Sequence, residues 1–186
     1  MNASITSRSD ANTALSETFT YDSLNRLRTE VRLPDDLERY RAIREMLAAP
    51  GRVGLAVTGT HGKSTSTALL GHLLIAAGMD PTVEVGAFMA AWGASVRPGK
   101  GAPFVVEADE FGDNFLNYHP AGAIVTNVEM DHPDYFADAA AVTASFERFV
   151  RGMSAHDAVG GRLLVITADD PGAIELTRRL GDWEGR

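Results

Sequence analysis

The stretch VGLAVTGTHGKSTSTALLGHLLIAAG, residues 53–78, decides the fold of this chain. Its first six residues form a short apolar run between glycines, as expected of a parallel strand that is covered on both faces. From Ser64 on, leucines recur at helical spacing (Leu69, Leu70, Leu73, Leu74), and Gly78 suits the end of a helix. The pattern predicts a strand, a glycine loop and a helix over residues 64–77.

The loop in this stretch, GTHGKST, has the composition of a phosphate-binding loop. Glycines let backbone N–H groups point inward, and the N-terminus of the following helix adds partial positive charge. Lys63 adds a full positive charge for the terminal phosphates, and the Ser64 hydroxyl is placed to reach a magnesium ion. The predicted nucleotide-binding residues are Gly59, Thr60, His61, Gly62, Lys63, Ser64 and Thr65.

This loop is shorter than the eight-residue P-loop, because Val57 stands where that pattern requires glycine. A plain strand-to-helix turn with an exposed lysine is the alternative interpretation. A dinucleotide fingerprint is excluded, since the Gly99 and Gly101 pair lacks the third glycine and does not join a strand to a helix. Zero cysteines and no His-Glu-x-x-His motif argue against a zinc hydrolase.

Outward from the loop, strands and helices continue to alternate. Further strands are predicted over residues 82–85, 104–107, 123–126 and 163–167. One helix is predicted to begin near Asp138 with an apolar stripe, and another is capped by Asp170; the stripes are Val142, Phe146, Phe149 and Val150 in the first and Ile174, Leu176 and Leu180 in the second. The fold class is therefore α/β, a mostly parallel sheet with helices on both faces.

The ends and the size of the chain indicate one domain with a tail. Its 186 residues fit one domain of ordinary length. Residues 1–34 are rich in Ser, Thr, Asn and Asp without a sustained period and are predicted to be a flexible leader. A helix with Ile43 and Leu47 on one side leads into the domain over residues 35–186, and residues 86–101 form a glycine-rich irregular segment.

Composition excludes several classes of partner. A net charge of -8 gives no general attraction for nucleic acid or an anionic membrane. No apolar run approaches the roughly 20 residues of a membrane span, and no secretory signal is visible. Together with the lack of cysteine, this predicts a cytoplasmic protein without disulfides.

Several separated motifs, in order, resemble those of the Mur ligase family, ATP-dependent enzymes that add amino acids to the peptidoglycan precursor. The resemblance runs from about Tyr40 to Gly181 and is closest to the branch that joins L-alanine to UDP-N-acetylmuramate. Its motifs are GTHGKST, EADE at 107–110, FLNYHP at 115–120, AIVTNVEMDHPDYF at 123–136 and LLVITADDP at 163–171.

The resemblance implies a P-loop central domain that uses ATP and Mg²⁺. The muramyl carboxylate would attack the γ-phosphate of ATP, and the amine of L-alanine would displace phosphate from the resulting acyl phosphate. Lys63, Glu107 and His132 are the implied catalytic residues; Ser64 and Glu107 would hold one magnesium ion, and His132 would hold a second near the acyl phosphate. Asn127 is a candidate for positioning a phosphate of the nucleotide or the loop itself. Phosphates, metal ions and aligned reactants are what phosphoryl transfer requires in general.

The sequence leaves the roles of other side chains at these strand ends open. Asp109 and Glu110 either support the site or lie in a solvated turn, and Asp131 and Asp134 would orient His132 through hydrogen bonds. His72 and His119 are interpreted as structural. Lys63→Ala is expected to abolish nucleotide binding while leaving the fold intact.

Three alternative functions remain: a ligase that reattaches a recycled murein tripeptide, a nucleotide-dependent switch or transport ATPase, and a non-catalytic nucleotide-binding module. EADE with NVEMDHPDYF favours a ligase over a switch protein. Family members also carry an N-terminal domain for the UDP-sugar and a C-terminal domain, and both are expected to be missing here. This chain alone is therefore expected to bind Mg-ATP weakly and not to ligate.

Overall fold

The structure is a computed structural model that describes residues 5–9, 16–21, 27–29 and 36–186. The chain divides into two compact units, Met1–Ala42 and Ile43–Arg186. In the first unit three short strands pair antiparallel in the order β1-β2-β3: β1 (Ile5–Ser9), β2 (Ser16–Tyr21) and β3 (Leu27–Thr29). The sequence predicts no strands here; the flexibility of this leader stays a prediction, and the rest of it lies outside the described residues.

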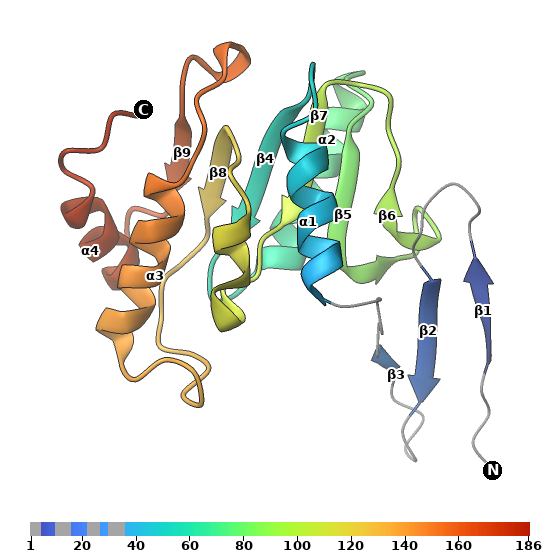
Figure 1. Ribbon diagram of the computed structural model, residues 1–186, viewed down its shortest axis with the longest axis horizontal. Helices are drawn as coiled ribbons and strands as arrows, with labels where there is room; N and C mark the ends of the chain where they lie inside the picture. The colour runs from blue at the N-terminus through green and yellow to red at the C-terminus, as the bar shows by residue number, and fades with distance from the viewer. Residues whose placement is uncertain (1–4, 10–15, 22–26, 30–35) are drawn as a thin grey trace. The chain divides into compact units, whose positions relative to one another are not determined.

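The second unit is built on a six-stranded sheet in the order β6-β5-β7-β4-β8-β9, with β4 near its centre (Figure 1). Five strands are parallel, and only β6 pairs antiparallel, with β5. The mostly parallel α/β sheet predicted from the sequence is confirmed. The strands are β4 (Val53–Thr58), β5 (Thr82–Met89), β6 (Ala94–Arg97), β7 (Pro103–Glu107), β8 (Gly122–Val125) and β9 (Leu163–Ile166).

In the part of the chain that the structure describes, four α-helices and two short 3-10 helices precede, connect or follow these strands. Figure 1 shows α2 behind the sheet and η1 in front of it, so both faces are covered. Asp138 caps α3 by accepting a hydrogen bond from the Ala141 N–H, and Asp170 caps α4 in the same way through Ala173. The helices are α1 (Asp36–Leu47), α2 (Lys63–Ala76), η1 (Phe111–Asn117), α3 (Ala139–Arg151), η2 (Asp157–Val159) and α4 (Pro171–Arg179).

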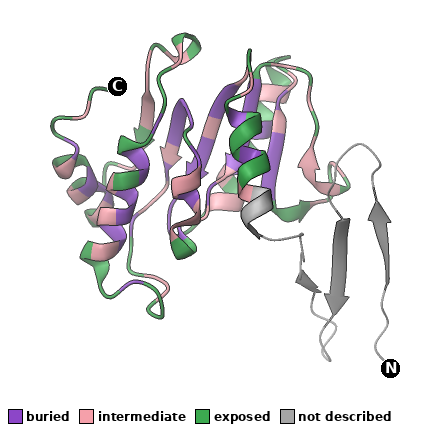
Figure 2. Ribbon diagram, viewed as in Figure 1, coloured by how far each residue is buried: buried purple, intermediate pink, exposed green. Residues whose placement is uncertain are grey.

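Hydrophobic side chains pack against the sheet, and its central strands are largely buried (Figure 2). Alternate residues of the parallel strands point to opposite faces. On the α2 face, valines of β4, β5 and β7 form a fully buried cluster, against which Leu70 and Leu74 of α2 pack. Elsewhere Phe115 of η1 stacks on Phe149 of α3 with ring centroids 4.8 Å apart.

Register brings the ends of three strands together. In the pairing of β4 with its neighbours, Val57 lies opposite Glu107 of β7 and opposite Ile124 of β8. The loops that follow β4, β7 and β8 therefore leave the same edge of the sheet side by side. This edge is where open α/β sheets bind their ligands.

Two details of the helices differ from the sequence predictions. Leu69 and Leu73 are 58% and 59% exposed, because α2 turns Thr67, Ala68 and Gly71 toward the sheet instead. Ile174 of α4 is likewise exposed, whereas Leu176 and Leu180 are buried as predicted. The stripe of α3 is confirmed: Val142, Phe146, Phe149 and Val150 are all buried.

The segment 86–101 is more regular than the sequence suggests. Strand β5 continues through Met89, four residues beyond its predicted end, and β6 returns antiparallel beside it. The backbone pairing of an edge strand produces no apolar alternation strong enough to be seen in the sequence.

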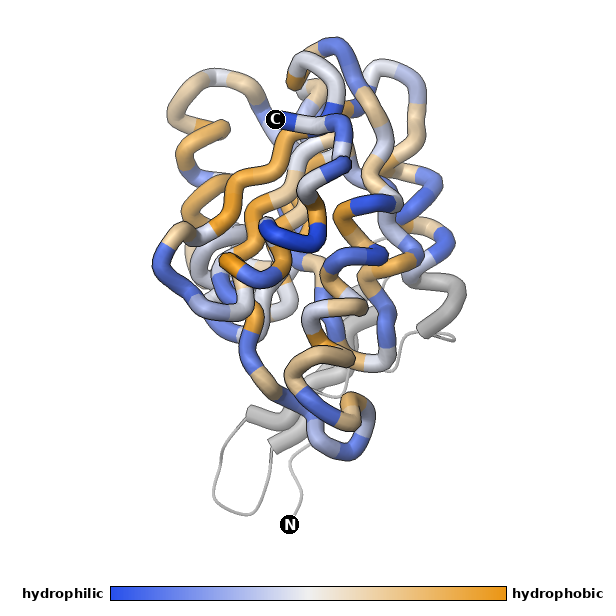
Figure 3. Tube along the Cα trace, turned by 90° about the vertical axis from the view of Figure 1, so that its left-hand side faces the viewer, coloured by the Kyte–Doolittle hydropathy of each residue, from blue (hydrophilic) through white to orange (hydrophobic). Residues whose placement is uncertain are grey.

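Along the Cα trace, hydrophobic residues concentrate in the strands (Figure 3). Among the helices that the structure describes, none combines the length and the apolar character needed to cross a bilayer.

Candidate functional site

The loop between β4 and α2 has the backbone geometry of an anion-binding turn. Gly59 and Gly62 have φ angles of 134° and 82°, which side chains disfavour. A Cβ at Gly59 would also overlap Thr126 Oγ1. Gly62 is the N-cap of α2, with no side chain filling that position, so the first amides of the helix face the loop.

Residues that follow β8 hold this loop from the side. The Asn127 amide oxygen accepts a hydrogen bond from the His61 N–H at 2.8 Å, and its Nδ2 donates to the His61 carbonyl at 3.3 Å. Thr126 Oγ1 donates to the same carbonyl at 2.6 Å. In this structure Asn127 therefore contacts the backbone of the loop, which fixes the loop's shape, while its predicted role toward a nucleotide stays a prediction.

Lys63, the first residue of α2, folds its ammonium group back into the loop. Its Nζ donates to the carbonyls of Gly59 and Thr60 at 2.9 and 3.3 Å. It also lies 2.8 and 3.1 Å from the two carboxylate oxygens of Glu110. The full positive charge predicted for the loop is thus located inside it, beside a carboxylate.

Glu107, the last residue of β7, faces the first turn of α2. Its Oε1 accepts a hydrogen bond from Ser64 Oγ at 2.9 Å, and its Oε2 accepts one from the Gly86 N–H at 2.6 Å. A Cβ at Gly86 would lie 2.9 Å from Oε1, so only glycine leaves room for the carboxylate in this position. The parallel pairing of β4 and β7 is what brings Ser64 and Glu107 together.

The pair formed by Ser64 and Glu107 is chemically suited to Mg²⁺. A hydroxyl and a carboxylate are the hard oxygen ligands that this ion prefers, with waters and phosphate oxygens completing its shell. Both side chains are partly exposed at the mouth of the loop, so solvent and a ligand can reach them.

Glu110, by contrast, is almost fully buried, with 1% of its side chain exposed. Burial raises the pKa of this carboxyl group, and the hydrogen bond and positive charge of Lys63 oppose the rise. The solvated-turn interpretation is therefore wrong for Glu110. It still describes Asp109, whose side chain is 49% exposed and lies 3.7 Å from Lys63 Nζ.

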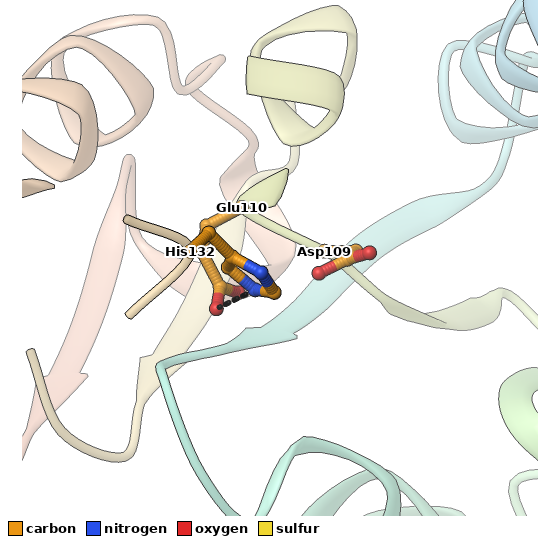
Figure 4. A group of neighbouring side chains, drawn as sticks. All are labelled: Asp109, Glu110 and His132. Atoms are coloured by element: carbon orange, nitrogen blue, oxygen red, sulfur yellow. Dashed lines mark ion pairs between the residues drawn. The ribbon is translucent and has the colours of Figure 1, made fainter. Parts of the chain in front are cut away.

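His132 lies with its ring beside the Glu110 carboxylate (Figure 4). Its Nε2 is 3.7 Å from Glu110 Oε1, and its ring contacts Phe111 with centroids 4.7 Å apart. The backbone of His132 is left-handed, with φ 52°, and its N–H donates to Asp131 Oδ1 at 2.7 Å. That N–H lowers the pKa of Asp131.

The predicted residues thus fall into two neighbouring groups. Ser64 bonds Glu107 at the loop, and the ligand atoms of His132, Glu110 and Asp109 lie within 4.8 Å of one another. Lys63, in the loop, contacts the second group through Glu110. Within the described residues, no hydrogen bond or ion pair links His132 to Ser64 or Glu107, or Asp134 to His132. The His72 ring contacts Trp92 at a tilt, and His119 Nδ1 bonds the Gly152 carbonyl, in keeping with structural roles.

Three residues of the site are absent from the predicted set: Thr126, Gly86 and, as a definite member, Glu110. Thr126 could have been predicted as a site residue, because it directly precedes Asn127 at the end of a predicted strand. Gly86 had none, because its contact with Glu107 depends on how β5 and β7 are paired.

Comparison with known proteins gives the family. The model of the Mur ligase middle domain matches residues 57–184. The chain is 46% identical over 143 residues to a UDP-N-acetylmuramate–L-alanine ligase of Arthrobacter sp. (strain FB24), covering 77% of this chain and 29% of the relative. It is 43% identical over 127 residues to the ligase of the same name from Frankia casuarinae, covering 68% and 24%.

Solved structures of similar proteins agree with the fold. A UDP-N-acetylmuramate-alanine ligase from Thermotoga maritima matches with a TM-score of 0.62 and 31% identity, over 78% of this chain and 31% of that one. A UDP-N-acetylmuramate:L-alanyl-γ-D-glutamyl-meso-diaminopimelate ligase from Neisseria meningitidis matches with a TM-score of 0.62 and 26% identity, over 80% and 52%. The chain spans between 24% and 30% of the length of the first four curated relatives.

Proposed function

The chain belongs to the Mur ligase family through its middle domain, and from this premise we propose that it supplies the ATP- and Mg²⁺-holding part of a cytoplasmic ligase. The reaction would join L-alanine to UDP-N-acetylmuramate in peptidoglycan precursor synthesis. The observation that carries the proposal is the meeting of Lys63, Ser64 and Glu107 at one glycine loop.

Each of these side chains has a task in phosphoryl transfer. The loop amides and the Lys63 ammonium would hold the β- and γ-phosphates and neutralise charge as the γ-phosphoryl group moves to the muramyl carboxylate. Ser64 and Glu107 would hold Mg²⁺, which supplies charge neutralisation between the phosphates. His132, which lies 3.7 Å from Glu110, would act near the sugar carboxylate and its acyl phosphate.

The resulting acyl phosphate would then react with the amine of L-alanine, and ADP and phosphate would leave. Parts of the enzyme that choose the amino acid are outside this middle domain in the family, so the identity of the amino acid rests on the relatives. Curated relatives at 42% to 46% identity are named as L-alanine ligases. The solved ligase named for a peptide substrate is 26% identical, which favours L-alanine over a recycled tripeptide.

Calorimetry with ADP and ATP tests the nucleotide part of the proposal. We expect saturable binding that is tighter with Mg²⁺ than with EDTA. A chain that binds neither nucleotide in the presence of Mg²⁺ would show that the loop assignment is wrong.

Release of phosphate from ATP tests the ligase part, with UDP-N-acetylmuramate and L-alanine added separately and together. This chain by itself is expected to show no turnover. If it does turn over, dependence on both co-substrates would support the L-alanine reaction, and replacement of L-alanine by the tripeptide would support the recycling ligase.

A further inference from the structure

Glu110 belongs to the EADE motif but has partners unlike those of Glu107 three residues earlier. Glu107 accepts hydrogen bonds from a hydroxyl and an amide, both electrically neutral. Glu110 instead faces the Lys63 ammonium, which both of its oxygens contact within 3.1 Å. Its carboxylate therefore places a negative charge directly against the phosphate-binding lysine of the loop.

The ammonium group of Lys63 has three protons, and its present acceptors account for all of them. These acceptors are the carbonyls of Gly59 and Thr60 and the carboxylate of Glu110. A phosphate oxygen that takes a proton from Lys63 must replace one of these acceptors. The carboxylate is the acceptor that carries charge, and it lies where a second anion brought to Lys63 would be repelled.

Burial makes this repulsion effective. The side chain of Glu110 is 1% exposed and that of Lys63 is 15% exposed, so water screens the pair only weakly. Glu110 is the N-cap of η1, and its own carbonyl accepts the Asp113 N–H at 3.0 Å, which fixes its backbone. Among the described residues, its carboxylate also pairs with His132 at 3.7 Å.

We propose that Glu110 is a positioning residue that competes with the nucleotide phosphate for the Lys63 ammonium. Glu110 keeps Lys63 folded into the loop, and a phosphate must take the ammonium from it. The competition is strongest for nucleotide without metal, because Mg²⁺ brings two positive charges that offset the carboxylate. This inference rests on the proposed nucleotide binding.

The test is calorimetric titration of ADP into the chain with EDTA and, separately, with Mg²⁺. Glu110→Gln keeps the shape of the side chain and removes its charge. We expect it to bind metal-free ADP roughly tenfold more tightly than the parent, since removing a like charge a few ångströms away favours an anion by about that much. The gain should be smaller with Mg²⁺, so the ratio of the two affinities falls.

Two controls separate charge from shape. Glu129→Gln removes an exposed carboxylate at the same edge of the sheet, from a residue whose backbone, not its side chain, bonds Thr60; it should change metal-free affinity far less. Glu110→Asp shortens the side chain but keeps the charge, and it should give no tenfold gain. If Glu110→Gln lacks a cooperative melt, Glu110→Met, which is similar in length and uncharged, replaces it with the same expected sign.

The outcomes distinguish the two proposals. A parent chain that does not bind ADP even with Mg²⁺ contradicts the proposed function. A parent that binds, together with a Glu110→Gln variant whose metal-free affinity is equal or weaker, overturns the competition and leaves nucleotide binding intact. An equal gain in Glu129→Gln would likewise overturn it, because general charge would then explain the effect.

Discussion

Charged pairs occur both at the phosphate loop and on the helices α3 and α4, but in opposite surroundings. At the loop, Glu110 is buried against Lys63. On the helices, Arg178 and Arg179 pair with Glu175, and Arg151 pairs with Glu147, all on exposed or half-exposed side chains. Helix α3 also packs through apolar side chains: Phe115, Phe146 and Phe149 contact one another with essentially no exposure.

The comparison shows that the contribution of an ion pair to the stability of this fold depends on how deeply the pair is buried. A buried pair is costly to break because the remaining charge stays without water, whereas an exposed pair is replaced by solvent. At the loop, a substitution that removes one partner of the pair should therefore affect both ligand binding and the stability of the fold. The aromatic packing of the helical layer supplies stability that is independent of charge.

The largest effect is expected for Lys63→Ala. It should abolish measurable nucleotide binding and also lower the free energy of unfolding by about 3–5 kcal/mol, because Glu110 loses its ammonium partner. This changes the expectation from the sequence that the fold would be untouched. Urea unfolding and calorimetry measure the two effects.

A double variant tests whether the unpaired Glu110 carboxylate causes this loss of stability. Lys63→Ala with Glu110→Gln should regain most of the stability but none of the binding. A single variant as stable as the parent would show that the buried pair contributes no more than an exposed one.

Phe149→Ala tests the helical layer. Loss of a fully buried aromatic ring should lower the free energy of unfolding by about 3–5 kcal/mol, with nucleotide affinity unchanged in the folded fraction. Ile174→Ala, on an exposed side of α4, is the matched control and should cost less than about 0.5 kcal/mol. A changed nucleotide affinity in Phe149→Ala would mean that the two regions are coupled.

Gly86→Ala tests the metal side of the loop. The new Cβ would displace the Glu107 carboxylate, so affinity for ADP with Mg²⁺ should fall roughly tenfold, while affinity with EDTA stays the same. Gly181→Ala is the control, because its Cβ would meet nothing closer than the Arg178 carbonyl at 3.5 Å. Equal losses with and without the metal would contradict a role for Gly86 in holding Glu107.

The smallest effect is expected for Glu175→Gln. Hydrogen bonds from Arg178 and Arg179 lower the pKa of Glu175 from 4.5 to about 2. Its contribution is therefore fully present above pH 4.5 and is lost as the pH falls toward 2. Thermal melts should show a slight difference between parent and variant at neutral pH, which disappears near pH 2; a difference that grows on acidification would contradict the assignment.

Much of the fold follows from local pattern. The apolar strands, the caps Asp138 and Asp170 and the stripe of α3 were all predictable, because each depends on residues close together in the sequence. The buried face of α2 could not be predicted from the sequence. Its leucines surround the helix, and the position of β5 and β7 decides which of them are covered.

By itself the sequence determined a glycine loop with Lys63 and Ser64 on a parallel α/β sheet, since spacing and residue type suffice for that. Only the tertiary structure decided which acid meets which group. Glu107 and Glu110 are both carboxylates of one short motif, yet the pairing of β7 with β4 and β5 directs the first to Ser64 and Gly86, and the start of η1 directs the second to Lys63. Such contacts join residues 20 to 50 positions apart, and the burial that sets their charge balance exists only once the strands are paired.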